Sequence, residues 1–530
     1  MTARCTAGHF LAVLTLLLGI AETAQAASSE YFTIEVVDAE TSRGVPLVEL
    51  RTTNNLVYYT DSAGIIAFRE EDLMGHEVFF AVKSHGYEYP ADGFGFRGVR
   101  LKPVAGEKTV IKLPRTNIAE RLCRVTGEGI YRDSLLVGRE PSKQIARSSG
   151  KIVGQDSVRA TIYRNKLFWI WGDTVGPRYP LGNFATTAAI SELPNRGGLD
   201  PSVGVALNYF LDAEGYSRGM VSRETISGPG PIWLGGLTTL NDDEGNERLV
   251  ASYARVETVG KVLERGLVAF NDKSETFEKL VQFDVDSPMY LEGHPIQVVE
   301  KGTPYFYCGY SVPYAMRVRA DWKSIQDPKQ YEGFTCLTLG SRFAKTKSSI
   351  ERTPDGHPVW AWKKNTSPLG YDEQEALVEA GMLKREDAWL PFVDIDTHKP
   401  CKPTAGSVRW NEYRNRWIAV FGQYGGTSQL GEIWYAEADS LTGPWSYAKK
   451  IITHDDYSFY NPVHHPFFDQ EGGRRIYLEG TYSMTFSGNT NPTPRYDYNQ
   501  IMYRLDLADP RLKLAVPETA APESSSTRSK

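Results

Sequence analysis

Cysteine is scarce in this chain, with five residues among 530. Four of them lie in the region expected to fold: Cys123, Cys308, Cys336 and Cys401. Their wide spacing matches no zinc-binding pattern and provides no disulfide framework, so the fold cannot depend on one. A single bridge between Cys308 and Cys336 is the one pairing that we keep as a hypothesis.

Positive charge is not in excess either. The chain has 59 Lys and Arg against 65 Asp and Glu, for a net charge of −6, which is not the basic footprint of a nucleic-acid-binding protein. The sequence also contains no P-loop, no dinucleotide fingerprint and no serine-nucleophile elbow. After the N-terminal segment there is no long apolar run, so we expect no membrane span and a soluble product.

The N-terminus has the features of a secretory signal in residues 1–26. Arg4 supplies the positive charge, residues 10–20 form the apolar core, and Ala24-Gln25-Ala26 fits a cleavage site of small residues. The apolar core is short for a membrane span. We therefore predict an exported protein, either periplasmic or extracellular.

Aromatic residues, glycine and proline are plentiful. The chain has 29 Tyr, 11 Trp, 48 Gly and 30 Pro, which favours a β-rich protein with many turns. Aromatic faces also suit a sugar-binding surface, because they stack on the apolar faces of sugar rings. At this length we expect two domains and a tail.

The first domain is predicted in residues 30–115. Short strands there alternate with Gly and Asp turns, which is typical of a β-sandwich. Residues 116–150 are interpreted as a polar linker with a short helix near 118–121. The fold class that we predict is all-β, an N-terminal β-sandwich followed by a five-bladed β-propeller.

The propeller is predicted in residues 151–512. Units of two to four short strands repeat five times there, each followed by a turn-rich link. Residues 341–399 interrupt this rhythm and contain a predicted helix at 372–380, so we interpret them as an insertion into the fourth blade. Residues 513–530 are low in complexity and are predicted to be a disordered tail.

One hairpin, residues 154–174, holds two aspartates. Asp156 lies near its start and Asp173 near its end. Residues 167–171 between them are apolar at every position, as in a strand buried on both faces. A carboxylate at the end of such a strand needs a partner, a metal, water or a catalytic task. An aspartate beside glycine also commonly caps a turn. Two acids on one hairpin favour a functional site.

A propeller brings distant carboxylates together, because the starts of its inner strands converge on one axis. Glycoside hydrolysis needs two carboxyl groups, one protonated and one ionised. The candidates are Asp156 and Asp173 in the first unit and Glu292 at the start of the third. No cofactor is required for this chemistry, although a structural calcium on the axis is a further hypothesis.

Other side chains are candidates for binding the substrate: His294, Arg409, Glu432, Trp434, His464, His465 and Tyr482. The paired histidines either line the pocket, ligate a metal together with His294, or hydrogen-bond to a neighbouring blade. Arg409 either contacts the substrate or braces a blade through a carboxylate. The aromatic residues either stack on sugar or pack between blades.

The first domain resembles a known family. The stretch VVDAETSRGVPLVEL, followed by TDSAGIIAF, is similar to the carboxypeptidase-regulatory, transthyretin-like sandwich. The resemblance covers only this domain. It implies an accessory module, so no catalytic residue is expected there.

The second domain resembles propeller glycoside hydrolases over about residues 150–510. Glu292-Gly293-His294-Pro295, followed by a glycine turn and an aromatic strand at 305–307, looks like the general-acid segment of glycoside hydrolase family 43, the arabinanases and xylosidases. Residues 433–436 and then Gly443-Pro444-Trp445 are similar to the strand and GPW pattern of the same clan.

The aspartate hairpin resembles a second group. Gly154-Gln155-Asp156 paired with Gly172-Asp173-Thr174 is similar to endo-D-arabinanase-type propellers, which implies that the two first-blade aspartates are the catalytic pair. The chain departs from family 43, whose base aspartate lies beside a proline; here Asp156 precedes Ser157, and the second unit has no matching motif. The roles of the three acids therefore stay open.

These observations predict a glycoside hydrolase that acts on a polysaccharide or oligosaccharide. The main alternative is a non-catalytic carbohydrate-binding or scaffold propeller, whose acids only cap turns. A lyase or another hydrolase on the same fold is the third possibility, because fold does not fix function. The expected partner is a carbohydrate in each of the first two cases.

Overall fold

The computed structural model describes residues 30–142, 145, 150–178, 185–258, 260–389, 392–426, 429–445, 447–454, 456–493 and 497–514. The predicted signal segment and the tail from residue 515 onward lie outside these ranges. Over the described ranges the protein is all-β, as predicted, with two α-helices, α1 (Arg132–Leu136) and α3 (Tyr371–Glu379). No helix in this part of the chain is long and apolar enough to cross a membrane.

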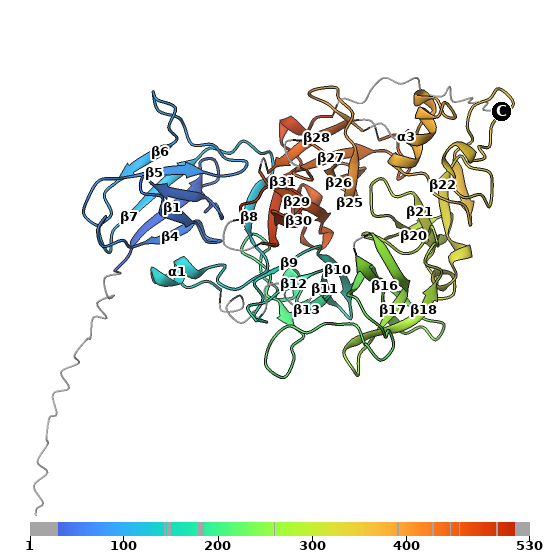
Figure 1. The fold of residues 1–530 in the computed structure, drawn as a ribbon, viewed down its shortest axis with the longest axis horizontal. Helices are drawn as coiled ribbons and strands as arrows, with labels where there is room; N and C mark the ends of the chain where they lie inside the picture. Colours follow the sequence, from blue (N-terminus) through green and yellow to red (C-terminus); the bar gives the residue numbers. More distant parts are fainter. Residues whose placement is uncertain are drawn as a thin grey trace, which may run out of the picture.

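Two sheets form the N-terminal part, on the left of Figure 1. The first has the order β4-β1-β7 and consists of β1 (Phe32–Asp38), β4 (Ile65–Phe68) and β7 (Lys108–Leu113). The second has the order β3-β2-β5-β6 and consists of β2 (Glu49–Thr52), β3 (Val57–Tyr59), β5 (Val78–Lys83) and β6 (Gly98–Leu101). Both sheets contribute to one hydrophobic cluster. The first sheet supplies Ile34 and Phe68, and the second supplies Leu50 and Phe80.

Five further sheets follow one another around the right-hand part of Figure 1, and we call them the ring. The first contains β10 (Arg159–Tyr163), β11 (Lys166–Trp171), β13 (Thr187–Ser191) and β14 (Asn208–Tyr209). The second contains β15 (Ile232–Asn241), β16 (Glu247–Thr258), β17 (Lys261–Asn271) and β18 (Thr276–Phe283). The third contains β19 (Ile296–Glu300), β20 (Thr303–Cys308), β21 (Met316–Arg319), β22 (Glu332–Thr335) and β23 (Ala361–Lys364).

The last two sheets of the ring include strands from outside their own run of sequence. The fourth has the order β24-β28-β27-β26-β25, from β24 (Val393–Asp394), β25 (Pro403–Asn411), β26 (Arg416–Gln423), β27 (Glu432–Ala438) and β28 (Tyr447–Thr453). The fifth has the order β29-β30-β31-β8, from β29 (Ser458–His464), β30 (Arg475–Ser483), β31 (Asn499–Asp506) and β8 (Glu120–Arg124). A short pair, β9 (Gly154–Gln155) with β12 (Thr174–Val175), flanks the first sheet.

Strand β8 corrects the interpretation of residues 116–150 as a linker with a helix near 118–121. All five residues of β8 are buried, and they pair antiparallel with β31, so that Arg124 lies opposite Ile501. Residues 120–124 form a strand because they hydrogen-bond to β31, which is distant in the sequence. The local sequence does not reveal this partner. The outer strand of the fifth sheet therefore comes from the segment that precedes the first sheet.

The segment at 341–399 also differs from its prediction as an insertion into the fourth blade. The predicted helix at 372–380 is confirmed by α3 (Tyr371–Glu379). The segment supplies β23 to the third sheet and β24 to the fourth, where β24 pairs parallel with β28. It therefore connects two sheets rather than extending one.

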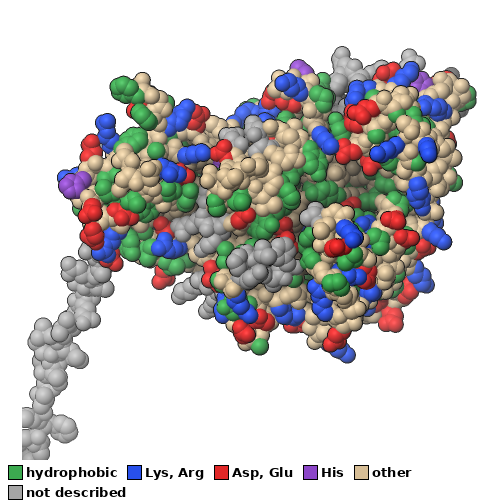
Figure 2. Space-filling view, viewed as in Figure 1, with side chains coloured by type: hydrophobic (Ala, Val, Ile, Leu, Met, Phe, Trp, Pro, Cys, Tyr) green, Lys and Arg blue, Asp and Glu red, His purple; other side chains and the backbone are tan. Residues whose placement is uncertain are grey.

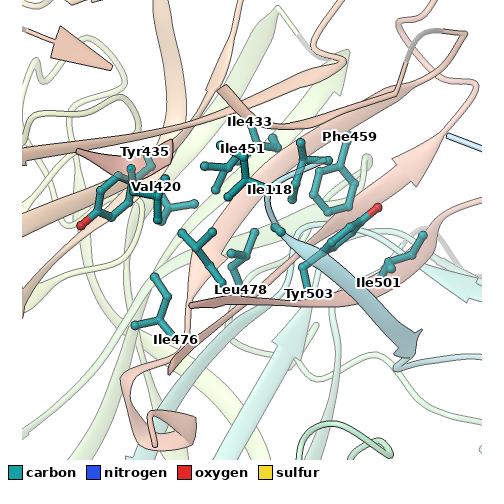
Figure 3. Packing of buried hydrophobic residues seen from close by; sticks show 14 of the residues in the cluster. Ile118, Val420, Ile433, Tyr435, Ile451, Phe459, Ile476, Leu478, Ile501 and Tyr503 are labelled. Atoms are coloured by element: carbon teal, nitrogen blue, oxygen red, sulfur yellow. The ribbon is translucent and has the colours of Figure 1, made fainter. Parts of the chain in front are cut away.

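Adjacent sheets of the ring pack face to face through apolar side chains. Figure 3 shows the cluster between the fourth and fifth sheets, where Val420, Ile433 and Tyr435 meet Leu478 and Tyr503. In the first sheet, residues 167–171 of β11 are all buried, as their apolar pattern predicted. Burial on both faces explains why residues 167–171 of β11 have no polar side.

The four described cysteines are buried thiols. The hypothesis of a Cys308–Cys336 bridge is therefore wrong. Burial raises the pKa of Cys308 to about 12 and that of Cys336 to about 11, so both remain protonated at neutral pH.

Because β8 completes the fifth sheet, we expect truncation of a buried side chain in β8 to lower the free energy of unfolding considerably. Leu122 in β8 is fully buried, whereas Leu339 is 67% exposed. We expect Leu122→Ala to lower the free energy of unfolding by ~2–5 kcal/mol, through lost burial and a cavity. The matched Leu339→Ala should change it by less than ~0.5 kcal/mol. Denaturant unfolding of both variants measures this, and equal effects would contradict the closure.

Candidate active site

Each sheet of the ring has an edge strand at one side, namely β10, β15, β19, β25 and β29. Of these, β10 contacts β15 and β25 contacts β29. In the view of Figure 2 the molecule is hollowed near the centre of the ring. The residues at or just before the starts of these strands include Asp156, Glu292 and Tyr460.

Asp156 is held at the base of the β10–β11 hairpin. Its Oδ1 accepts the backbone N–H of Asp173 at 2.8 Å, and its Oδ2 accepts the hydroxyl of Tyr460 from β29 at 2.9 Å. Burial and the nearby charge of Asp173 raise the pKa of Asp156 to about 7, although the Tyr460 hydrogen bond opposes the increase. Asp156 therefore both caps a turn and titrates near neutral pH.

Asp173 lies half-buried immediately after β11. Its Oδ1 accepts the indole N–H of Trp233, from β15 of the second sheet, at 2.8 Å. Within the described residues its Oδ2 has no hydrogen-bond donor. Burial raises the pKa of Asp173, and the Trp233 hydrogen bond partly offsets this. One oxygen is thus fixed and the other is available to a ligand.

Glu292 precedes β19 and is positioned by the second sheet. Gly236 in β15 has φ +52°, and a Cβ there would lie 2.7 Å from the carbonyl carbon of Leu291 and 3.0 Å from the backbone nitrogen of Glu292. The Glu292 Oε1 accepts the hydroxyl of Tyr290 at 3.1 Å. Burial raises the pKa of Glu292, against the opposing effects of Tyr290 and of Arg265 and Arg159.

Arg159, the first residue of β10, lies close enough to Asp156 and Glu292 for both charges to act on it. Its Nη1 donates to the carbonyl oxygen of Ser157 at 2.8 Å, and its Nε lies 3.8 Å from the position of a Cβ on Gly235. Burial lowers the pKa of the guanidinium, while the charges of Asp156 and Glu292 favour its protonated form. The cation therefore lies in the field of both acids.

A polar chain links the third sheet to the fifth across the same region. The Tyr310 hydroxyl donates to Asn461 Oδ1 at 3.1 Å, and Asn461 Nδ2 donates to Ser157 Oγ at 2.6 Å. Tyr310 is 40% exposed. Its ring is thus held in place while one face remains open to solvent.

Two of the predicted binding residues, His294 and Arg409, meet next to Glu292. The carbonyl oxygen of His294 accepts the Tyr314 hydroxyl at 2.9 Å and Arg409 Nη1 at 3.3 Å. Burial and the nearby charges of Arg159 and Arg409 hold the pKa of His294 well below its usual value, so the imidazole is neutral. Arg409 therefore braces the structure by donating hydrogen bonds to main-chain carbonyls, and not by pairing with a carboxylate.

The histidine pair is buried rather than exposed. His464 Nε2 lies 2.8 Å from Asp469 Oδ1, and His465 Nε2 lies 3.1 Å from Glu479 Oε2. Both side chains are 1% exposed. The interpretation that one histidine is exposed is therefore wrong, and both have a carboxylate partner.

The structure does not bring the remaining predicted residues to the site. Tyr482 is fully buried in the cluster between the fourth and fifth sheets, where its ring lies 4.5 Å from that of His454, so it offers no surface to a sugar. Trp434 is buried and donates to Gln423 at 2.8 Å. Glu432 is fully buried, 3.8 Å from Lys450.

Sequence reasoning missed several residues that shape the site, namely Arg159, Trp233, Tyr290, Tyr310, Tyr460 and Asn461. Tyr460 and Asn461 precede the histidine pair in the same motif, and Arg159 lies within the aspartate hairpin, so their positions carried a signal. Trp233 had none. Among the residues that the structure describes, no group of three or more His, Cys, Asp or Glu is arranged to hold a metal.

Comparisons with known proteins give only distant similarities. The sequence matches no known family model and no curated protein. The fold is similar to that of an exo-β-1,3-galactanase from Phanerochaete chrysosporium, with 10% identity over 74% of this chain and 65% of that chain and a TM-score of 0.36. It is also similar to an exo-1,5-α-L-arabinanase from a bovine ruminal metagenomic library (9% identity, 67% and 94%, TM-score 0.33) and to an endo-arabinase from Bacteroides thetaiotaomicron (11%, 67% and 96%, 0.32). Scores this low assign neither an activity nor a substrate to this chain.

The hydrogen bond from Tyr460 predicts the direction in which the pKa of Asp156 changes when the bond is removed. The hydroxyl favours the ionised carboxylate, so Tyr460→Phe should raise this pKa above its value of about 7. Carbon-13 NMR titration of the aspartate carboxyl groups measures it. Tyr413→Phe, at a residue 45% exposed, is the control. A pKa that falls or stays constant in Tyr460→Phe would refute the assignment.

The raised pKa of Asp156 also predicts how stability depends on pH. The folded-state value is about 7, whereas the unfolded-state value is about 3.9, so the folded state binds more protons between them. The contribution to stability is therefore complete below about pH 4 and is lost as the pH rises through about 7, by roughly 1.4 kcal/mol for each unit of pKa difference. Asp156→Asn should become more stable relative to the natural protein between pH 5 and pH 8. Denaturant unfolding at both pH values measures this, and a constant difference would contradict the raised pKa.

Proposed function

We propose that this chain is an exported glycoside hydrolase, a five-bladed β-propeller that carries an N-terminal transthyretin-like sandwich as an accessory. The observation that carries the proposal is a set of three acids with raised pKa values, Asp156 just before β10, Asp173 just after β11 and Glu292 just before β19, with Arg159 in the field of Asp156 and Glu292. Buried carboxyl groups whose pKa values are raised towards neutrality are typical of acid–base catalysis.

The two aspartates differ in a way that suits different roles. Asp156, with a pKa of about 7, is partly protonated at neutral pH and is proposed to donate a proton to the oxygen of the leaving sugar. Asp173 has an oxygen not engaged by the described residues and is proposed as the base or nucleophile. Glu292, with its raised pKa, is the alternative acid.

Aromatic side chains near the acids are proposed to hold the sugar rings. Tyr310 is 40%, Tyr424 42% and Phe486 54% exposed, and the ring of Phe486 packs edge-on against Tyr460, 5.5 Å away. Apolar ring faces exposed beside polar groups are suited to stacking on a carbohydrate. Tyr482 and Trp434 are buried and are not kept as stacking positions.

One observation favours the second candidate, a propeller that binds carbohydrate without cleaving it. Both oxygens of Asp156 accept hydrogen bonds from protein groups, as expected of a carboxylate with a structural task. The two candidates differ in product: a hydrolase releases reducing ends, a lyase would add an unsaturated product, and a binding protein releases neither.

Substitution of Asp173 tests the hydrolase. We expect Asp173→Asn to lose at least ~100-fold in turnover, because an amide cannot act as base or nucleophile. Release of reducing ends from a panel of polysaccharides measures this, while circular dichroism checks the fold. Asp243→Asn, at a surface residue, should retain full activity. Full activity in Asp173→Asn would refute the role of Asp173, and no product from any polysaccharide with the natural protein would favour the binding candidate.

A further inference from the structure

Three arginines around Glu292 form no direct ion pair with the described residues. Among the described residues, no carboxylate oxygen lies within 4.0 Å of a nitrogen of Arg159, Arg265 or Arg409. Arg159 donates to the Ser157 carbonyl at 2.8 Å, and Arg409 donates to main-chain carbonyls. Arg265 lies 4.4 Å above the centre of a tyrosine ring. All of these contacts are with neutral groups.

Two arginines that are shielded from solvent elsewhere in the ring, Arg255 and Arg317, have a carboxylate partner. Arg255 lies 3.2 Å from Glu264, and Arg317 lies 2.6 Å from Glu332. Arg121 in β8 is unpaired as well, but it is 1% exposed and its Nε and Nη1 are closed off from solvent. A ligand cannot reach Arg121 without separating the N-terminal sheets from the ring.

The three unpaired arginines are grouped by the backbone. The Nε of Arg159 lies 3.8 Å from a Cβ position on Gly235, and the next residue, Gly236, contacts the backbone of Glu292. Arg409 Nη1 reaches the carbonyl of His294, two residues after Glu292, at 3.3 Å. Arg265 lies over Tyr290, which hydrogen-bonds to Glu292. The cations therefore surround one short stretch of chain at the candidate active site.

Asp156, the acid whose charge acts on Arg159, does not fully neutralise this cation at neutral pH. Burial raises the pKa of Asp156 to about 7, so it is only partly ionised there, and the neutral His294 adds no negative charge. A shielded charge is costly unless it is paired. The planar guanidinium matches the geometry of a carboxylate or an oxyanion such as sulfate.

We propose that this site takes an anionic sugar, one that carries a carboxylate or a sulfate, with Arg409 and Arg159 binding the negative group. The proposal rests on the proposed function, and it names the class of substrate for the same site. The competing explanation is that the arginines only keep the acids ionised. In that case the site would not discriminate between an acidic and a neutral sugar.

Binding to the full chain tests the proposal without requiring turnover. The probes are glucuronate and galacturonate, the neutral sugars glucose and galactose, and glucose 6-sulfate, each followed by calorimetry or by ligand-observed NMR. We expect the acidic sugars to bind at least ~10-fold more tightly than the neutral ones, with a preference that shrinks as salt is added. The ratio between glucuronate and glucose 6-sulfate identifies which anion fits. Neutral sugars that bind equally or more tightly would overturn the proposal, whatever the variants do.

A charge-removing substitution locates the anion. Arg409→Gln should weaken binding of the acidic sugar ~10-fold and leave the neutral sugar unchanged, whereas Arg409→Lys should restore part of the loss. Arg416→Gln, in the same sheet and paired with Asp439, is the control and should change neither. An unchanged preference in a folded Arg409→Gln protein would contradict the role of Arg409.

The outcomes separate this proposal from the hydrolase. If acidic sugars bind preferentially but no acidic polysaccharide is cleaved, the anion site stands and the hydrolase fails. If neutral polysaccharides are cleaved equally by the natural protein and by Arg409→Gln, the hydrolase stands and the anion site fails.

Discussion

Close approach between neighbouring backbones fixes the positions of the acids. A Cβ on Gly172 would lie 2.1 Å from Asp156 Oδ1, and one on Gly236 would lie 2.7 Å from Leu291. A Cβ on Gly236 would meet backbone atoms, so glycine is needed where the second sheet meets the third, and a Cβ on Gly172 would displace the Asp156 carboxylate from its place in the hairpin. The Tyr460 hydrogen bond to Asp156 and the backbone of Glu292 lie at these two close approaches.

Local pattern was sufficient for some elements. Residues 167–171 are apolar at every position, and only a strand buried on both faces satisfies that pattern. The helix at 372–380 was equally predictable, because it is nine residues long and has acidic residues in its first turn, which favour a helix start. Asp173 was proposed for a related reason, since a carboxylate directly after an apolar strand stands out in the sequence.

Other features depended on contacts between distant parts of the chain. Trp233 holds Asp173 across a sheet boundary, and nothing in its own sequence distinguishes it from a tryptophan that packs between sheets. Tyr482 shows the converse, because an aromatic residue near the fifth unit looked like a sugar platform but is buried in the core. Arg409 was found as a candidate, yet its lack of an acidic partner emerged only from the folded arrangement.

The pairing of β8 with β31 has a consequence for biosynthesis. β8 leaves the ribosome before every other strand of the ring, and β31 leaves last. Until then β8 is an unpaired strand whose apolar residues have no partner, a condition that invites aggregation or the recruitment of a chaperone. Non-local pairing of this kind also slows folding. For a chain proposed to be exported, the ring would close only after the last strand has emerged.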